Sequence, residues 1–152
     1  MLSQKQLEDL RQTRRHGIGR MLLLARKDFM ARLYATLAAD GNPMPPSSGG
    51  TLLPFIDLEG TRSVDIARRM GVSKQAIGKA LKELEDACLV TRTQDGVDGR
   101  AFLVTFTPQG VEYLLKIHEA IDKVEQHYAA LVGEAGLEDL RRHLAAIAYQ
   151  ES

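Results

Sequence analysis

The segment 73–82 carries the side chains of this sequence best suited to molecular recognition, because polar, basic and small residues alternate there at helical spacing. Gln75 can bond the edge of adenine through two hydrogen bonds, and Lys79 can reach the acceptors of guanine. Ala76 is suited to contact a thymine methyl group. Gly78 either lets the backbone approach DNA closely or is a tolerated surface glycine. These residues predict a helix that recognises bases in the major groove.

The surrounding residues predict how that helix is positioned. Apolar residues recur at helical spacing on both sides of Gly71, which supplies the positive φ of a tight interhelix turn, and Ser73 is suited to cap the second helix. We expect Val72 and Ile77 to pin the second helix to the core. Two crossing helices, a helix-turn-helix, are therefore predicted. The apolar set is Ile66, Ala67, Met70, Ile77, Ala80, Leu81 and Leu84.

Basic and hydroxyl side chains around this motif are candidates for phosphate contacts. Lys74 and Lys82 are expected to meet phosphates, the alternative being solvated surface charge. Arg62 and Arg92 are expected to flank the DNA backbone. Ser63 is predicted either to cap its helix or to present its hydroxyl and backbone N–H to a phosphate.

A β-hairpin is predicted directly after the motif, with strands at residues 89–93 and 101–105 and a turn-rich loop between them. Such a hairpin is a wing, which we place at residues 91–103. Arg100 at its tip is suited to enter a narrow minor groove, and Asp98 is suited to hold that guanidinium or the hairpin in place.

The remaining elements are predicted to be helical. We expect a long first helix over residues 16–39, and residues 2–12 are either an additional helical segment or a frayed arm. Thr107 and Pro108 are suited to begin a further helix as cap and first helical residue. The other predicted segments are a loop at 41–50, a short helix at 51–58, a break at 133–136 and a last helix at 137–149.

Composition limits the classes of protein to consider. The chain has 152 residues, 44% hydrophobic residues and one cysteine, Cys88. It has no apolar segment long enough to span a membrane, and its N-terminus lacks the apolar core of a signal peptide. We therefore expect a cytoplasmic protein. No phosphate-binding glycine loop, nucleophile elbow or closely spaced histidine set is present, so neither an enzyme, a cofactor nor a metal is expected. Redox sensing by Cys88 is a minor alternative.

The formal net charge is zero, but it is unevenly distributed. Residues 1–40 carry a net charge of +4 and residues 61–100 of +2, whereas residues 41–60 carry −2 and residues 101–152 carry −4. The acids of the second motif helix lie at its far end, so its leading end is basic. This distribution is compatible with a nucleic-acid partner.

Four ordered strings resemble the MarR family of bacterial transcription regulators. Residues 63–73 resemble the family's helix, turn and cap, and residues 84–92 resemble its Leu-Glu, Gly-Leu-Val, Arg passage. Residues 98–100 resemble its wing-tip Asp-x-Arg, and residues 107–110 its Leu-Thr-x-x-Gly string. The chain departs from the family at Cys88, which replaces a glycine, and at Phe106, which replaces a leucine. Cys88 implies a different local turn or backbone strain.

The resemblance implies a mainly α fold with a small β wing, in which N- and C-terminal helices form a dimerisation domain around a winged helix-turn-helix. It implies residues 1–40 as a dimerisation helix with a basic arm, 51–106 as the DNA-binding domain with recognition helix 73–87, and 107–152 as dimerisation helices. The expected function is that of a homodimeric regulator, more often a repressor, on a pseudo-palindromic double-stranded DNA operator.

The resemblance also implies a small aromatic effector that relieves DNA binding. Arg26, Tyr34, Phe55 and His118 lie on suitable helices to line its site, although a core or surface role is the plainer alternative for each. Two other functions remain open: a winged-helix module that binds protein, and a ligand-binding dimer that does not bind DNA. Exposed apolar residues on the second helix would favour the former, and a weak salt dependence would argue against DNA.

Overall fold

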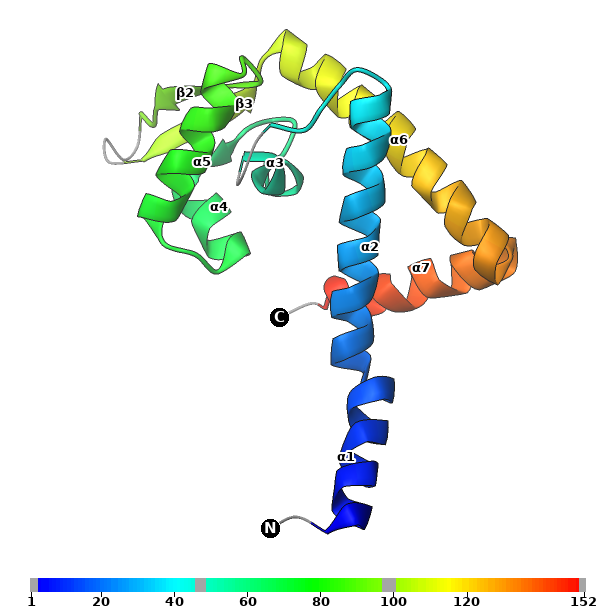
Figure 1. Ribbon diagram of the computed structural model, residues 1–152. Helices are drawn as coiled ribbons and strands as arrows, with labels where there is room; N and C mark the ends of the chain where they lie inside the picture. Colours follow the sequence, from blue (N-terminus) through cyan, green and yellow to red (C-terminus); the bar gives the residue numbers. More distant parts are fainter. Residues whose placement is uncertain (1–2, 46–48, 97–100, 151–152) are drawn as a thin grey trace. The chain divides into compact units, whose positions relative to one another are not determined.

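The computed structural model describes residues 3–45, 49–96 and 101–150. It is mostly helical with one small sheet, as the sequence predicts (Figure 1). The helices, in chain order, are α1 (Gln4–His16), α2 (Ile18–Ala39), α3 (Gly49–Leu52), the 3-10 turn η1 (Leu53–Phe55), α4 (Ser63–Met70), α5 (Lys74–Asp86), α6 (Pro108–Val132) and α7 (Glu134–Ala148). The strands are β1 (Thr61–Arg62), β2 (Val90–Gln94) and β3 (Phe102–Phe106).

The chain divides into two compact units. One, the helical unit, comprises Met1–Thr36 and Ile121–Ser152, and the other, the winged unit, comprises Leu37–Ala120. Within the described ranges, none of the helices combines the length and apolar character needed to cross a bilayer.

The winged unit is built on a three-stranded antiparallel sheet in the order β1-β3-β2. β2 and β3 form the predicted hairpin, one residue later at each strand than the sequence suggests, with Arg92 opposite Val104. β1 was not predicted, because a strand of two residues has no periodicity of its own. Its residues pair with β3 at Leu103 and Val104.

The core of the winged unit lies between α3, α4, α5 and the sheet. Its fully buried side chains come from each of these elements, and Phe106 packs against it as a benign apolar residue. The short helix predicted at 51–58 is instead α3 followed by η1, so Gly49 and Gly50 are helical rather than part of the loop. The buried set includes Leu52, Leu53, Ile66, Ile77, Leu81, Leu84, Val90 and Val104.

The junction of α5 with β2 contains the strain that Cys88 implied. Cys88 has φ 59° and is the only residue other than glycine with a positive φ among those described. The chain therefore keeps the left-handed turn at a residue with a Cβ atom, a conformation that costs roughly 1–2 kcal/mol.

The junction of β3 with α6 follows the prediction. α6 begins at Pro108, and the Thr107 hydroxyl accepts a hydrogen bond from the Gly110 N–H at 2.9 Å. The same hydroxyl donates to the Cys88 carbonyl at 2.6 Å. Thr107 thus caps the helix and joins it to the turn that precedes β2.

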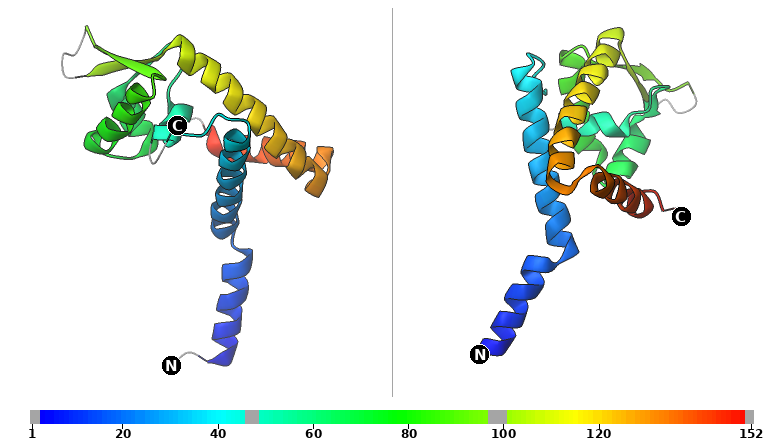
Figure 2. Two further views of the ribbon diagram at one scale, coloured as in Figure 1. Left: turned by 45° about the horizontal axis from the view of Figure 1, so that its top comes forward. Right: turned by 90° about the vertical axis from the view of Figure 1, so that its right-hand side faces the viewer.

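The helical unit contains α1, most of α2, the end of α6, and α7. Residues 4–16 form a complete helix rather than a frayed arm, capped by the Ser3 hydroxyl, and Gly17 separates it from α2 with a change of direction (Figures 1 and 2). At the other end of the unit, Gly133, with φ 81°, is the single residue that separates α6 from α7. The last helix therefore begins at Glu134 rather than at the predicted residue 137.

Candidate nucleic-acid interface

α5 divides cleanly into a buried and an exposed face. Ile77, Ala80, Leu81 and Leu84 are buried, at the i, i+3, i+4 and i+7 positions of one helical face. Because this face is fixed in the core, the opposite face must point outward. Its exposed residues are those predicted to contact DNA: Ser73, Lys74, Gln75, Ala76 and Lys79.

The beginning of α5 is held by local interactions. The Ser73 hydroxyl accepts a hydrogen bond from the Ala76 N–H at 3.3 Å, so Ser73 is the N-cap, as predicted. Gly71 ends α4 with φ 66°, the positive value that the sequence required. Val72, however, is 42% exposed and does not anchor α5. Its apolar character was misleading, because a turn residue takes its direction from the backbone rather than from a helical period.

Gly78 lies on α5 beside the exposed face and is half-buried. A Cβ atom built there would have no atom within 4 Å. Packing within the chain therefore gives no reason for a glycine at this position.

Ser63 does not cap α4. Arg62 is the N-cap and makes no side-chain cap, while Ser63 is the first helical residue. The Ser63 hydroxyl instead accepts a hydrogen bond from the Phe102 N–H at 3.3 Å, which joins α4 to β3. The helix begins one residue early because β1 keeps Arg62 extended up to its start.

The lysines of α5 differ in their surroundings. Lys82 lies 3.5 Å from Asp86 in an exposed i,i+4 ion pair, which contributes little to stability. Lys74 and Lys79 form no ion pair within the described part of the chain and are exposed. The two lysines nearest the start of α5 are thus unpaired among the described residues, and the exposed pair of Lys82 is a weak one.

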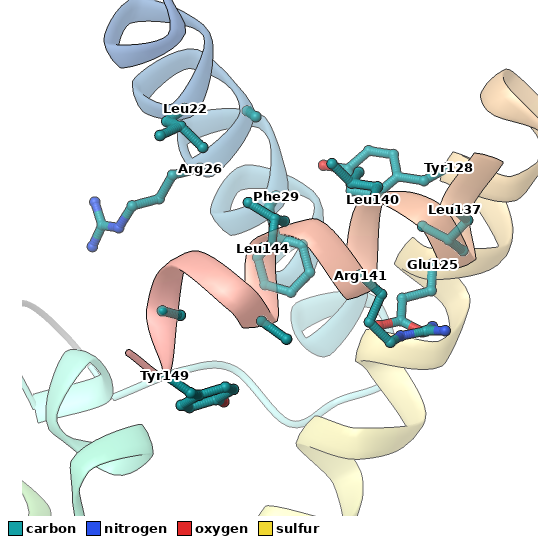
Figure 3. A pocket seen from close by; sticks show the side chains of 13 residues that line it. Leu22, Arg26, Phe29, Glu125, Tyr128, Leu137, Leu140, Arg141, Leu144 and Tyr149 are labelled. Carbon is teal, nitrogen blue, oxygen red and sulfur yellow. The ribbon is translucent and has the colours of Figure 1, made fainter. Parts of the chain in front are cut away.

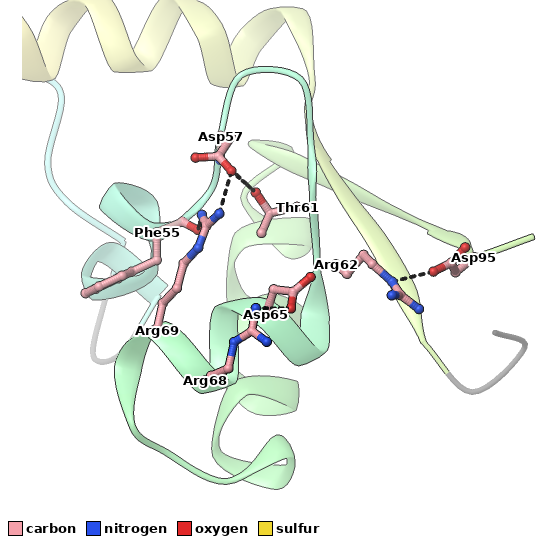
Figure 4. A network of polar contacts seen from close by, with 8 residues as sticks. All are labelled: Phe55, Asp57, Thr61, Arg62, Asp65, Arg68, Arg69 and Asp95. Atoms are coloured by element: carbon pink, nitrogen blue, oxygen red, sulfur yellow. Dashed lines mark hydrogen bonds and ion pairs between the residues drawn. The ribbon is translucent and has the colours of Figure 1, made fainter. Parts of the chain in front are cut away.

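The two arginines predicted to flank DNA are both paired with carboxylates. Arg92 Nη2 lies 2.5 Å from Glu85 Oε2, and the Arg92 guanidinium lies 5.5 Å from the centre of the Phe102 ring. The hydrogen bond with Glu85 raises the pKa of Arg92 above its ordinary value. Arg62 Nε lies 2.6 Å from Asp95 Oδ2 in an ion pair without the alignment of a hydrogen bond (Figure 4).

Sequence reasoning missed these acidic partners, as it missed a third pair behind α4. Arg69 donates to Asp57 at 2.9 Å and to the Phe55 carbonyl at 3.1 Å (Figure 4). The hydrogen bond from Arg69 lowers the pKa of Asp57. An acid and an arginine twelve residues apart give no periodic signal, so only the fold brings them together.

The predicted wing-tip residues, Asp98 and Arg100, lie outside the described residues. Those on either side of the tip are described, and the Asp95 N–H donates to the Ala101 carbonyl at 2.9 Å. A hollow of about 160 Å³ lies where α4, α5 and the hairpin meet. It is lined by Ser63, Val64, Lys74, Ile77, Gly78, Leu81, Arg92 and Phe102.

The four residues suggested for an effector are divided between the two units. Arg26 and Tyr34 lie on α2 in the helical unit, whereas Phe55 and His118 lie in the winged unit. Arg26 lines an apolar cavity of about 500 Å³ between α2, α6 and α7, and the other three do not line it (Figure 3).

The wall of this cavity contains a polar contact that the sequence did not indicate. The Tyr128 hydroxyl donates to Asp28 at 2.8 Å, and Arg32 donates to the same carboxylate at 2.7 Å. The pKa of Tyr128 is raised to about 12, mainly by partial burial of the hydroxyl and secondly by its hydrogen bond to Asp28. Among the described residues, no group of His, Cys, Asp or Glu is arranged to hold a metal ion.

Residues 51–101, which comprise the helix-turn-helix and most of the hairpin, match the model described as MarR family. Over this segment the chain is similar to the MarR family. The chain is 26% identical over 104 residues to the "Putative transcriptional regulatory protein for hcr operon" of Thauera aromatica. The match covers 68% of this chain and 63% of that relative, so the chain spans less than two thirds of its length.

Solved structures share the MarR-type fold. A MarR family transcriptional regulator from Rhodococcus sp. RHA1 is similar with a TM-score of 0.72 and 22% identity, over 87% of this chain and 92% of that one. CouR from Rhodococcus jostii RHA1 bound to p-coumaroyl-CoA has a TM-score of 0.68 and 21% identity, over 90% and 95% of the two chains. The repressor CouR bound to a 23-mer DNA duplex has a TM-score of 0.70 and 22% identity, over 98% and 99%.

Proposed function

We propose that this protein is a sequence-specific regulator of transcription that binds double-stranded DNA through α5. The observation that carries the proposal is the division of α5, whose apolar face is fixed in the core while its first two turns expose polar and basic side chains. A helix presented in this way fits the major groove, with the residues near its start facing base edges.

In this proposal the exposed residues of α5 have distinct roles. Gln75 and Lys79 contact bases, with adenine and guanine as their preferred partners, and Ala76 contacts a thymine methyl group. Lys74 and Lys82 contact phosphates. Ser73, the N-cap of α5, also contacts the DNA through its backbone or its hydroxyl. Ser63, at the first turn of α4, is close to the phosphate path through its N–H.

The wing contributes at the minor groove. Arg100 enters the groove and Asp98 supports it, a role that the family resemblance implies for the wing-tip Asp-x-Arg. Both residues remain predictions from the sequence.

We infer that the working form is a homodimer. α7 has fifteen residues and buries none of them within one chain, and α1 buries none of its thirteen. Large apolar side chains are correspondingly exposed on the helical unit, among them Ile18, Leu23, Leu131, Ile147 and Tyr149. Exposure of so many large apolar side chains on one unit supports a protein interface.

A symmetric dimer would recognise a symmetric operator. Two-fold symmetry presents two copies of α5, so the expected site is pseudo-palindromic with half-sites about one turn of DNA, roughly 34–36 Å, apart. One winged unit makes few base contacts, so two are needed for useful affinity.

Repression relieved by a small aromatic effector completes the proposal. It is supported by the two CouR structures, one with a DNA duplex and one with p-coumaroyl-CoA. An effector acts only through a difference in its affinity for the DNA-competent and other states. Arg26, Tyr34, Phe55 and His118 remain candidates for contacts with it.

The test is selection of DNA from a random-sequence pool by the purified full chain, followed by sequencing. Enrichment of a pseudo-palindrome would support the proposal, and Gln75→Ala should change the preferred base at one symmetric pair of positions. Recovery of unenriched DNA, or of none from a folded dimer, would contradict it and favour a protein-binding or ligand-binding module.

A further inference from the structure

The hairpin is joined to the rest of the winged unit by two arginines, each held by a carboxylate of the same unit. Arg92 is on β2, its partner Glu85 is on α5, and the Phe102 ring beneath its guanidinium is on β3. One side chain thus connects three elements. The side chains of Arg92 and Glu85 are only 27% and 28% exposed.

The second arginine acts at the point where the hairpin leaves the sheet. Arg62 on β1 pairs with Asp95, which directly follows β2 and whose side chain is 14% exposed. The Asp95 N–H also closes the base of the hairpin through the Ala101 carbonyl. The two ion pairs therefore attach the hairpin to α5 on one side and to β1 on the other.

These contacts are unfavourable for a phosphate ligand at either arginine. To bind phosphate, Arg92 would have to leave both Glu85 and the Phe102 ring, or bring a phosphate beside the Glu85 carboxylate. Like charges at such distances repel, and partial burial strengthens the repulsion. Lys74 and Lys79 are exposed and form no ion pair within the described part of the chain, so neither would have to leave a carboxylate to bind phosphate.

We propose that Arg92 and Arg62 are positioning residues, which fix the wing against α5 and β1 and contribute no phosphate contact. This inference rests on the proposed function of the winged unit. It revises the expectation from sequence, in which both arginines flank the DNA backbone. The phosphate contacts of α5 then come from its lysines.

The carboxylate partners provide the decisive variants. If Arg92 contacts phosphate, Glu85→Gln frees it and should tighten DNA binding. If Arg92 positions the wing, Glu85→Gln should loosen the wing and weaken binding, as Arg92→Met does. Asp95→Asn tests Arg62 in the same way, and Lys74→Met serves as the comparison for a lost phosphate contact.

The experiment measures the affinity of the full-length protein for its selected operator as a function of salt. Loss of one phosphate contact flattens the slope of log K against log salt by about 0.9, or about 1.8 for both copies in a dimer. We expect Lys74→Met to flatten the slope in this way. We expect Arg92→Met, Arg62→Met, Glu85→Gln and Asp95→Asn to weaken binding with an unchanged slope.

A second measurement needs no DNA. In thermal unfolding, Arg92→Met and Glu85→Gln should each lower the midpoint by about 2–4 °C, and the double variant by less than the sum. Additive effects would overturn the positioning role, as would tighter DNA binding by Glu85→Gln or a flattened slope for Arg92→Met. If the wild-type protein selects no DNA, the proposed function fails, whereas non-additive unfolding would still establish the ion pair as a structural link.

Discussion

Gly110 lies so close to Leu89 that a Cβ atom at position 110 would stand 2.0 Å from the Leu89 carbonyl oxygen. The first turn of α6 therefore approaches the start of β2 at a distance that only glycine allows. The neighbouring Thr107 N–H donates to the same carbonyl at 3.0 Å. This contact gives a steric reason for the glycine of the Thr-x-x-Gly string.

We predict that Gly110→Ala destabilises the protein by about 1–3 kcal/mol or more, because backbone rather than a flexible side chain must move. Chemical denaturation of the two proteins checks it. Gly19→Ala is the matched control, since a Cβ atom at that helical position has no atom within 4 Å. A Gly110→Ala protein as stable as the control would disprove the steric account.

Gly78→Ala should separate stability from DNA binding. The open space around this position predicts a gain in stability of about 0.5–1 kcal/mol, the ordinary cost of a glycine within a helix. If the backbone approaches DNA there, affinity should fall about tenfold, or about 1.4 kcal/mol. Unfolding and operator binding are measured on the same preparation. Unchanged affinity would identify Gly78 as a tolerated surface glycine.

Cys88→Gly should stabilise the protein by about 0.5–1 kcal/mol, because glycine adopts a positive φ without the strain of a Cβ atom. Cys88→Ala keeps the Cβ atom and should give no such gain. Equal stability of the two variants in urea would show that the turn carries little strain.

The raised pKa of Tyr128 predicts that the stability of the protein depends on pH at alkaline pH. Its pKa is raised to about 12 in the folded chain, above the ordinary tyrosine value of 10.0. The native state therefore keeps a proton that the unfolded state loses first, and the stabilisation is complete below pH 10 and is lost as pH rises toward 12.

Tyr128→Phe removes this dependence. Its free energy of unfolding should fall less steeply than that of the wild type between pH 10 and 12, as followed by urea denaturation. The wild type should also show a tyrosinate absorbance change near pH 12 that the variant lacks. Parallel stability curves for the two proteins would contradict the raised pKa of Tyr128 in the folded chain.

The sequence predicts those parts of the fold that local rules determine. The helical period and cap of α5, the positive φ of Gly71 and the Thr107 cap depend on residues within a turn or two of one another, and all were predicted. The exposed face of α5 follows from the same periodicity. The role of this face in DNA binding is our proposal and does not follow from the fold alone.

What the sequence did not predict depends on contacts between distant segments. The helix start at Ser63 shifted because β1 pairs with β3, which no local cap rule includes. Arg92 and Arg62 were assigned by charge alone, and their partners Glu85 and Asp95 become neighbours only when the hairpin folds onto α5 and β1. The four effector candidates were chosen by helix and chemistry, and two lie in each unit.

Binding of the full chain to its selected operator at several salt concentrations, for the wild type and Lys79→Ala, tests the central claim most directly. Lys116→Ala is the control, because it removes an exposed lysine of α6, beyond the helix-turn-helix. We predict steep salt dependence for the wild type and a loss of about 1–3 kcal/mol per half-site with relaxed specificity for Lys79→Ala. Lys116→Ala should bind like the wild type. Equal binding by all three proteins, or binding indifferent to salt, would contradict the assignment of α5 as the DNA-binding helix.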